Sequence, residues 1–296
     1  TYDHNVYDSV RGATKYLYTN ATDSEATNAE RLKTFDSNGF TVGTQHAVNE
    51  NTHTFVAWNW KANGSGSSNT NGSINSTVSV NTDAGFSIVS YAGTGSNATV
   101  GHSLSKSPEM IIIKNRSSSA NWPIYHHKNT SAPETDYLKL DTTAATADNS
   151  TFWNDTAPTS SVFTIGTDND VNESGSNMIA YCFHSVDGYS KVGSYTGNGN
   201  ANGTFVYTGF KPMMVISKYT GTENWNIIDT KRSPHNLMED LLKPDSSAVE
   251  IDTQIDIDFL SNGFKPRINS GFLNGDGHTI IYIAFAETPF KYSNAR

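Results

Sequence analysis

The chain has 296 residues, of which 17% are charged and 11% are aromatic, and its formal net charge at pH 7 is −9. This acidic balance argues against nucleic acid or an anionic membrane as a partner, because both attract positively charged surfaces. The single cysteine, Cys182, excludes an intrachain disulfide, and its apolar surroundings predict that it is buried. A composition rich in Asn, Ser, Thr and Gly favours short strands joined by polar turns over helices.

Residues 1–62 carry the second part of a pattern that is complete only later in the chain. The stretch Phe35-Asp36-Ser37-Asn38-Gly39-Phe40 matches residues 259–264, and its Ser-Asn-Gly predicts a turn because Asn and Gly tolerate positive φ. An apolar run that closes each copy occurs at residues 56–58, 179–181 and 283–285. We therefore expect residues 1–62 to be the C-terminal half of a β module whose first half is missing.

Residues 63–84 are nearly all small and polar. The first half of this stretch has the composition of a linker, and the weak alternation over residues 73–80 predicts an edge strand of the next module. The later junction, at Val186-Asp187-Gly188, has no spacer. We expect the last two modules to pack against each other and the first to hinge.

Residues 85–187 and 188–296 repeat each other. Pro108-Glu109-Met110-Ile111-Ile112-Ile113-Lys114 recurs 104 positions later as residues 212–218, and Asn121-Trp122 recurs as Asn224-Trp225. The unbroken apolar runs at 110–113 and 213–216 have the length of strands buried on both sides. A repeat of about a hundred residues is the size of a domain. Six or seven short strands in each repeat predict an all-β fold of tandem antiparallel β-sandwich modules, jelly-roll or Ig-like, arranged as an extended rod.

One stretch departs from the strand pattern. Apolar residues at helical spacing between Pro234 and Leu242 predict a short surface helix. His126 and His127 are adjacent on an expected strand and therefore point to opposite faces, so they do not chelate one metal ion together.

The sequence contains no phosphate-binding loop, no nucleophile elbow and no Cys/His spacing typical of a metal site. We therefore expect no catalytic residues, no metal and no cofactor. Trp122 and Trp225 are equivalent in the repeat, which favours a place in the core. Trp153 has no equivalent in the last module, and with Asn154 and Asp155 it is the candidate site for a glycan, whose rings stack on exposed aromatic side chains.

Several stretches resemble a family of virion proteins of tailed phages that is abundant in marine phages. The resemblance rests on residues 7–13, 35–40, 56–62, 85–89 and 93–100, on Lys114-Asn115-Arg116, and on the ending at 289–296, and it covers essentially the whole chain. It implies a structural or tail-fibre-like protein, and it implies no catalytic residues.

Three functions follow as hypotheses. The first is a non-enzymatic structural component of a virion, such as a tail fibre, an appendage or a capsid-surface protein. It would be located on the virion or outside the cell, self-associate as a homo-oligomer, a trimer above all, and contact other virion proteins. The alternative is a lectin-like module that binds host surface glycans. The third, a polysaccharide depolymerase, is disfavoured because such phage enzymes usually rest on β-helices with short repeats.

Overall fold

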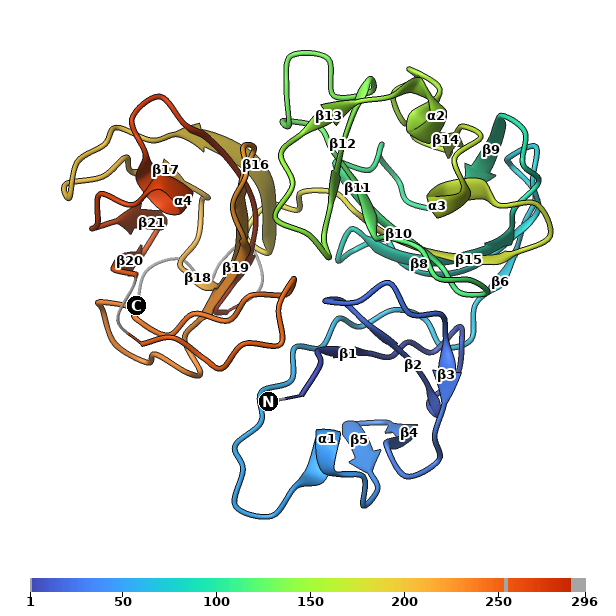
Figure 1. Cartoon of the computed structure of the whole chain (residues 1–296), viewed down its shortest axis with the longest axis horizontal. Coiled ribbons are helices and arrows are strands. Elements are labelled where there is room, and N and C mark those ends of the chain that lie inside the picture. Colours follow the sequence, from blue (N-terminus) through green and yellow to red (C-terminus); the bar gives the residue numbers. More distant parts are fainter. Residues whose placement is uncertain (1, 253–254, 289–296) are drawn as a thin grey trace.

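The computed structural model describes residues 2–252 and 255–288. It is mostly β, with 38% strand and 6% helix, and its sheets are antiparallel. Figure 1 shows three lobes around a common centre: residues 2–62 in blue, 63–187 from cyan to green, and 188–288 mainly in orange and red. These are called segments I, II and III below. The arrangement is closed, which differs from the extended rod expected from the sequence.

Segment I holds two small sheets and one helical turn. Its elements are β1 (Asn5–Val6), β2 (Lys15–Tyr18) and β3 (Ala26–Thr27) in one sheet, β4 (Leu32–Asp36) and β5 (Gly39–Val42) in the other, and α1 (His46–Asn49). Asp36 pairs with Gly39, so the turn predicted at Ser37-Asn38-Gly39 forms a hairpin with a two-residue loop.

Segment II is built on one large sheet. Its strand order is β13 (Ala147–Asp148), β12 (Asp136–Lys139), β11 (Pro123–His126), β10 (Met110–Asn115), β15 (Asn177–Phe183), β8 (Phe86–Ala92), β7 (Ser76–Asn81) and β6 (Ser67–Asn69). Across from it lie β9 (Ala98–Gly101), β14 (Val162–Ile165), α2 (Ser150–Trp153) and α3 (Asn169–Asn172). A strand, β7, does form where an edge strand was expected within residues 73–80, but it is not at the edge of the sheet, because β6 from the preceding polar stretch pairs with its other side.

Segment III pairs two smaller sheets. One has the order β16 (Ser190–Thr196), β22 (Thr279–Ala286), β18 (Pro212–Tyr219) and β19 (Trp225–Asp229), and the other β17 (Val206–Tyr207), β21 (Gly263–Pro266) and β20 (Ile257–Leu260). The helical turn α4 (Gly271–Asn274) precedes β22. The helix expected at 234–242 is wrong. Met238, Leu241 and Leu242 instead form isolated bridges with Ile257, Ile251 and Ile227, because tertiary pairing overrides the local spacing.

Three apolar cores organise the molecule. One lies inside segment II, around Ile111, Ile113 and Cys182, and one lies inside segment III. The third core is shared by all three segments. It is formed by those faces of the sheets that point away from the cores of segments II and III. Its members include Leu17 from segment I, Ile124 and Tyr181 from segment II, and Ile227 and Phe285 from segment III.

The shared core explains the unbroken apolar runs. On β10, Met110 and Ile112 face the shared core while Ile111 and Ile113 face the core of segment II. On β18, Met214 faces the shared core and Val215 faces the core of segment III. The prediction of strands buried on both sides is therefore confirmed. Segment I also contributes Trp58 and Trp60 to this core, so it is packed against both other segments and is not a hinged unit.

Candidate functional site

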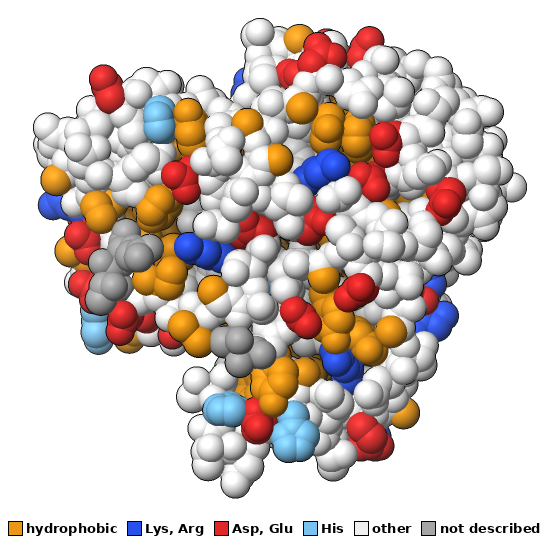
Figure 2. Space-filling model, viewed as in Figure 1, with side chains coloured by type: hydrophobic (Ala, Val, Ile, Leu, Met, Phe, Trp, Pro, Cys, Tyr) orange, Lys and Arg blue, Asp and Glu red, His pale blue; other side chains and the backbone are white. Residues whose placement is uncertain are grey.

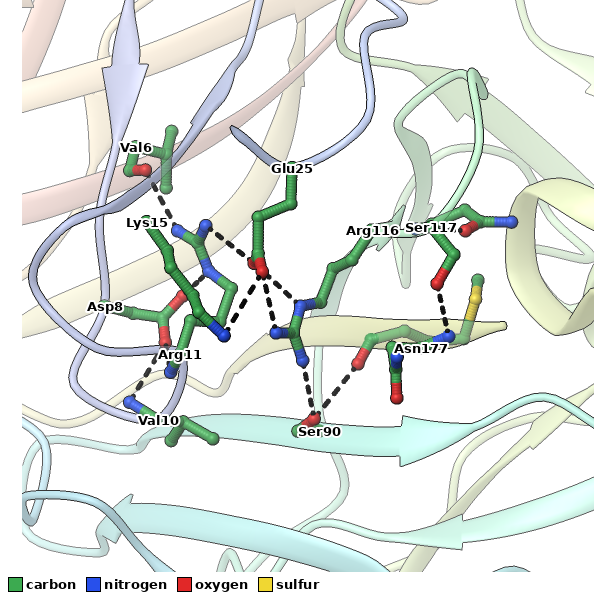
Figure 3. Close-up of polar contacts among 12 residues, drawn as sticks. Val6, Asp8, Val10, Arg11, Lys15, Glu25, Ser90, Arg116, Ser117 and Asn177 are labelled. Carbon is green, nitrogen blue, oxygen red and sulfur yellow. Dashed lines mark hydrogen bonds and ion pairs between the residues drawn. The ribbon is translucent and has the colours of Figure 1, made fainter. Parts of the chain in front are cut away.

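The most elaborate polar arrangement lies where segment I meets segment II (Figure 3). After β1 the chain turns at Asp8, whose Oδ1 accepts the backbone N–H groups of Val10 at 3.0 Å and Arg11 at 2.8 Å. The Arg11 guanidinium bonds Asp8 Oδ2 through Nε and the carbonyl oxygen of Val6 through a terminal nitrogen at 2.9 Å. Both side chains are buried, and each satisfies the other's charge.

This pair reaches across to segment II. The Tyr181 hydroxyl donates to Asp8 Oδ2 at 2.7 Å, although the two residues are 173 positions apart. Burial raises the pKa of that hydroxyl well above its usual range, so it stays a donor. Glu25 of segment I bonds Arg116 of segment II through both carboxylate oxygens, at 2.8 and 3.0 Å. Burial alone would raise the pKa of Glu25, but the Arg116 guanidinium holds it below its usual value.

The same arrangement recurs after β19 in segment III. Asp229 Oδ1 accepts the N–H groups of Lys231 and Arg232 at 2.9 and 3.1 Å, and Arg232 bonds Asp229 Oδ2 at 2.7 Å and the Ile227 carbonyl at 2.8 Å. The group that reaches Asp229 from the next segment is the Trp58 indole N–H, at 3.2 Å. Segment III is thereby joined to segment I as segment I is joined to segment II.

In segment II the corresponding position is His126, the last residue of β11. Its Nδ1 accepts the N–H of Lys128 at 3.2 Å, and its Nε2 lies 3.3 Å from the Tyr282 carbonyl oxygen of segment III. The neutral tautomer with a proton on Nε2 satisfies both contacts. Burial, and to a smaller extent the neighbouring His127, lowers the pKa of His126 to about 3. The contact of Asp8 with Tyr181 joins segment I to II, that of His126 with Tyr282 joins II to III, and that of Asp229 with Trp58 joins III to I. Together these three contacts form a closed ring of segments.

A second set of contacts joins the same segments in the reverse direction. Trp122 Nε1 donates to the Tyr18 carbonyl of segment I at 2.8 Å, and Trp225 Nε1 donates to the Lys139 carbonyl of segment II at 2.8 Å. His4 occupies the corresponding place two residues before Val6, and its Nε2 lies 2.9 Å from the Ser246 carbonyl of segment III. Trp122 and Trp225 are fully buried, so their predicted place in the core is confirmed.

Lys114 and Lys218, which the repeat aligns, are buried and hold main-chain carbonyls. Lys114 Nζ donates to Thr22 of segment I at 2.8 Å, and Lys218 Nζ to Thr143 of segment II at 3.4 Å. Backbone N–H groups of Ala120 and Glu223 donate to the same two carbonyls at 2.9 and 3.0 Å. Burial lowers the pKa of each lysine to about 8.

Sequence reasoning missed these contacts. A signal for them was present, since Asp8-Ser9-Val10-Arg11 and Asp229-Thr230-Lys231-Arg232 share the spacing Asp-x-x-Arg and Lys114 recurs as Lys218. The partners were not visible, because Tyr181, Trp58 and Tyr282 come from other segments.

The structure does not present the predicted glycan residues as a stacking platform. Trp153 is 2% exposed, and its indole N–H donates to the Asp136 carbonyl at 3.0 Å, so neither face of the ring is open to a sugar. The stacking role expected for Trp153 is therefore at odds with its burial, because α2 turns the ring into the core of segment II. Asn154 and Asp155 lie outside on the surface, both at positive φ. Asn154 borders a shallow polar hollow of about 260 Å³ together with Asn97, to which it is hydrogen-bonded at 2.6 Å.

A second hollow, of about 290 Å³, lies beside the junction of segments II and III. Asp187, Lys191, Thr208 and Tyr207 line it, and the Tyr207 side chain is 65% exposed. A carboxylate, an ammonium and an exposed ring thus converge at one place that the sequence did not single out. Within residues 2–252 and 255–288, no group of three or more His, Cys, Asp or Glu side chains is placed to hold a metal ion. Over the same residues, no helix is long and apolar enough to cross a membrane.

Replacing Arg11 by Met should destabilise the protein by roughly 3–5 kcal/mol, because the buried Asp8 carboxylate would lose its cation. The measurement is the free energy of unfolding in urea. Lys33→Met, which removes an exposed ion pair with Glu30, is the control and should leave the unfolding midpoint nearly unchanged. An equal effect of the two substitutions would contradict the structural role of Arg11.

His126→Gln should remove part of the acid sensitivity of the fold. Because the pKa of His126 is about 3 in the folded chain and about 6.5 when unfolded, the unfolded chain binds the extra proton below pH 6.5. Stability from this residue is therefore present above pH 6.5 and is lost as the pH falls toward 3. Urea titrations at pH 7 and pH 5 should show the original protein losing about 2 kcal/mol more than the variant. Identical losses would show that His126 is not buried as a neutral ring.

The comparisons with known proteins place the chain in a family. No curated protein and no solved structure gives a significant match. A family model described as a domain of unknown function (DUF7483) matches residues 1–289. The match covers nearly the whole chain, and the protein therefore belongs to the DUF7483 family.

Proposed function

We propose that this chain is a non-enzymatic structural component of a phage virion, such as a tail fibre, an appendage or a capsid-surface protein, built from repeated β-sandwich modules of about 100 residues. The observation that carries the proposal is the recurrence of inter-segment contacts. Asp8, His126 and Asp229 occupy equivalent positions in the three segments, and each is hydrogen-bonded to a neighbouring segment. The same holds for His4, Trp122 and Trp225 at a second set of equivalent positions. The buried polar side chains named above hold one segment to the next.

The conditions outside a cell favour a mechanical role for a protein stabilised in this way. A particle outside the cell has no supply of cofactors and no redox enzymes to maintain disulfides. Buried charges that are paired, such as Arg11 with Asp8, and a core shared by three segments give stability without either. The family of phage virion proteins that the sequence resembles points to the same place, the virion or the extracellular space.

Self-association and contact with other virion proteins complete the proposal. Fibres are usually closed oligomers, and we propose a homo-oligomer, a trimer above all. The apolar faces of the large sheets are used within one chain, in the shared core. The contacts between copies would therefore use the outer surfaces of the segments, with neither nucleic acid nor membrane as a partner.

The native mass tests the assembly. Light scattering behind size exclusion, at several protein concentrations, should give a multiple of the 32.2 kDa chain, with three as the expected number. A concentration-independent monomer would contradict self-association. Mass spectrometry of purified particles of the encoding phage should detect the chain. Its presence in the lysate but not in the particles would contradict the virion role.

The second candidate is carbohydrate binding, and the hollow beside Tyr207 favours it. The exposed Tyr207 ring offers a surface on which a sugar ring can stack, and the Asp187 carboxylate and Lys191 ammonium that line the same hollow offer hydrogen-bonding groups. The buried ring of Trp153 lacks that surface. A host surface glycan would be the ligand of the same appendage.

A glycan array tests this candidate. If the hollow binds sugars, the original protein should retain a defined glycan class, and Tyr207→Ala should lose about fivefold or more in affinity, since a stacking contact contributes on the order of 1 kcal/mol. Tyr2→Ala, which removes another exposed ring, is the matched control and should bind as the original does. No retained glycan, or equal binding by both variants, would exclude this hollow as the site.

A further inference from the structure

We infer that segment III holds a binding site for an extended strand of another polypeptide, along the outer edges of β16 and β17 and over the hollow beside Tyr207. In segment II the equivalent edges are covered by residues 67–81 of the chain itself. The inference does not depend on the virion role, and it names the kind of partner that segment III fits.

The covering stretch of segment II spans two strand edges at once. β7 is paired antiparallel with β8 along its whole length. The Ile74 N–H donates to the Thr99 carbonyl at 3.0 Å, and the Ser76 hydroxyl donates to the Gly101 carbonyl at 3.0 Å, so the same stretch also covers β9. Both β8 and β9 are thus closed on this side.

Hydrogen bonds show that β16 in segment III matches β8 in segment II. The Tyr91 hydroxyl at the end of β8 donates to a carbonyl of the helical turn α3 at 2.7 Å, and the Tyr195 hydroxyl of β16 donates to a carbonyl of α4 at 2.6 Å. The N–H groups of Gly93 and Gly197, two residues further on, donate to carbonyls just ahead of β15 and β22. The outer edge of β16 is therefore the counterpart of the edge that β7 covers.

The pairing of β9 and β17 shows that these two strands also match. The repeat aligns β14 with β21, and the phenylalanine of each pairs with a valine, Val100 on β9 and Val206 on β17. One position after the valine stands Gly101 in segment II and Tyr207 in segment III. The residues of β17 that point outward are therefore known.

The outer edge of β16 is open from Ser194 onward. β16 is the last strand of its sheet, and its bonds to β22 come from alternate residues, in phase with the contacts of Tyr189 and Gly197. Val192, Ser194 and Thr196 therefore point their backbone groups away from β22. Side chains of segment II satisfy those of Val192. Among the described residues, none bonds the N–H or C=O of Ser194 or the N–H of Thr196.

The outer edge of β17 is open as well. The Thr204 hydroxyl donates to the Thr196 carbonyl at 2.7 Å, so this edge lies beside that of β16. Within residues 2–252 and 255–288, none bonds the backbone groups of Phe205 and Tyr207, whose side chains are 44% and 65% exposed. Figure 2 shows hydrophobic side chains on the surface of the left lobe, where Figure 1 places segment III.

The residue at the matched position of β9 and β17 agrees with this difference in cover. A Cβ at Gly101 would lie 2.0 Å from the Asn69 side chain, so the covering stretch of segment II requires glycine there. Segment III has Tyr207 at that position, and its exposed ring is available to pack on a strand that lies along β16 as β7 lies along β8.

The connections between segments explain why only one pair of edges is covered. Residues 63–84 lead into segment II and supply β6 and β7, whereas segment III follows directly at Val186-Asp187-Gly188. A strand on β16 and β17 would therefore come from another polypeptide.

β7 shows the chemistry of that partner. Ile74, Ser76 and Val78 are buried, while Asn75 and Thr77 between them are exposed. The partner is therefore an extended strand with small or β-branched residues at alternate positions and polar residues between them. Such a strand covers Tyr207, so it and the glycan of the second candidate function exclude each other.

The experiment gives segment III the lead-in that segment II has. A second copy of residues 63–84 is inserted between Asp187 and Gly188 of the full chain, and hydrogen exchange is followed at the amides of Ser194 and Thr196. Exchange there should slow by at least about 100-fold, because amides that join a sheet exchange only on opening. Protection of β15 and β22 reports that the host fold is intact.

The matched control carries the same insertion with proline at the copied positions of Thr77 and Ser79, which face β8 in segment II. Proline removes two N–H donors and should restore fast exchange. Fast exchange in the unaltered insertion, with β15 and β22 still protected, would overturn the inference.

A second measurement leaves the junction unaltered and supplies the strand as a separate chain. Synthetic peptide 67–81 in millimolar excess should slow exchange at the same two amides at least about threefold, and the peptide with both prolines should not. Tyr207→Ala should weaken the effect of the peptide, whereas Phe35→Ala, which removes an exposed ring of segment I, should leave it unchanged. Unchanged exchange with the peptide, or equal slowing by the proline peptide, would contradict a strand-binding edge.

Discussion

The core shared by the three segments is the constraint on which the rest of the structure depends. Each large sheet has one face in a core of its own segment and the other in this common core. A strand in such a sheet must be apolar on both faces, which is why β10 and β18 carry unbroken runs of aliphatic residues. Since apolar burial contributes about 25 cal/mol per Å², the segments stabilise one another as well as themselves.

Polar contacts determine how the segments meet around this core. Apolar contact is not directional, whereas a buried carboxylate or indole N–H must find its partner at one place. Asp8 with Tyr181 and Asp229 with Trp58 therefore fix which surfaces face each other. Breaking one such contact leaves a buried charge or donor unpaired, so the ring contributes specificity as much as stability.

Segment I buries apolar side chains on one side and exposes them on another. Toward the centre it contributes Leu17, Trp58 and Trp60 to the shared core. Away from the centre it exposes Phe35, Phe40 and Phe55, at positions that the other segments bury or cover.

The sequence by itself determined the features that depend on near neighbours. The hairpin at Ser37-Asn38, the two-sided burial of residues 110–113 and the core positions of Trp122 and Trp225 follow from turn chemistry, periodicity and the repeat. Only the tertiary structure decided what depends on distant partners. The ring of Trp153 is buried because α2 sits against Tyr125 and Asp136, and residues 234–242 are extended because they bridge to distant strands. Local patterns report which faces are apolar, but the fold decides what covers them.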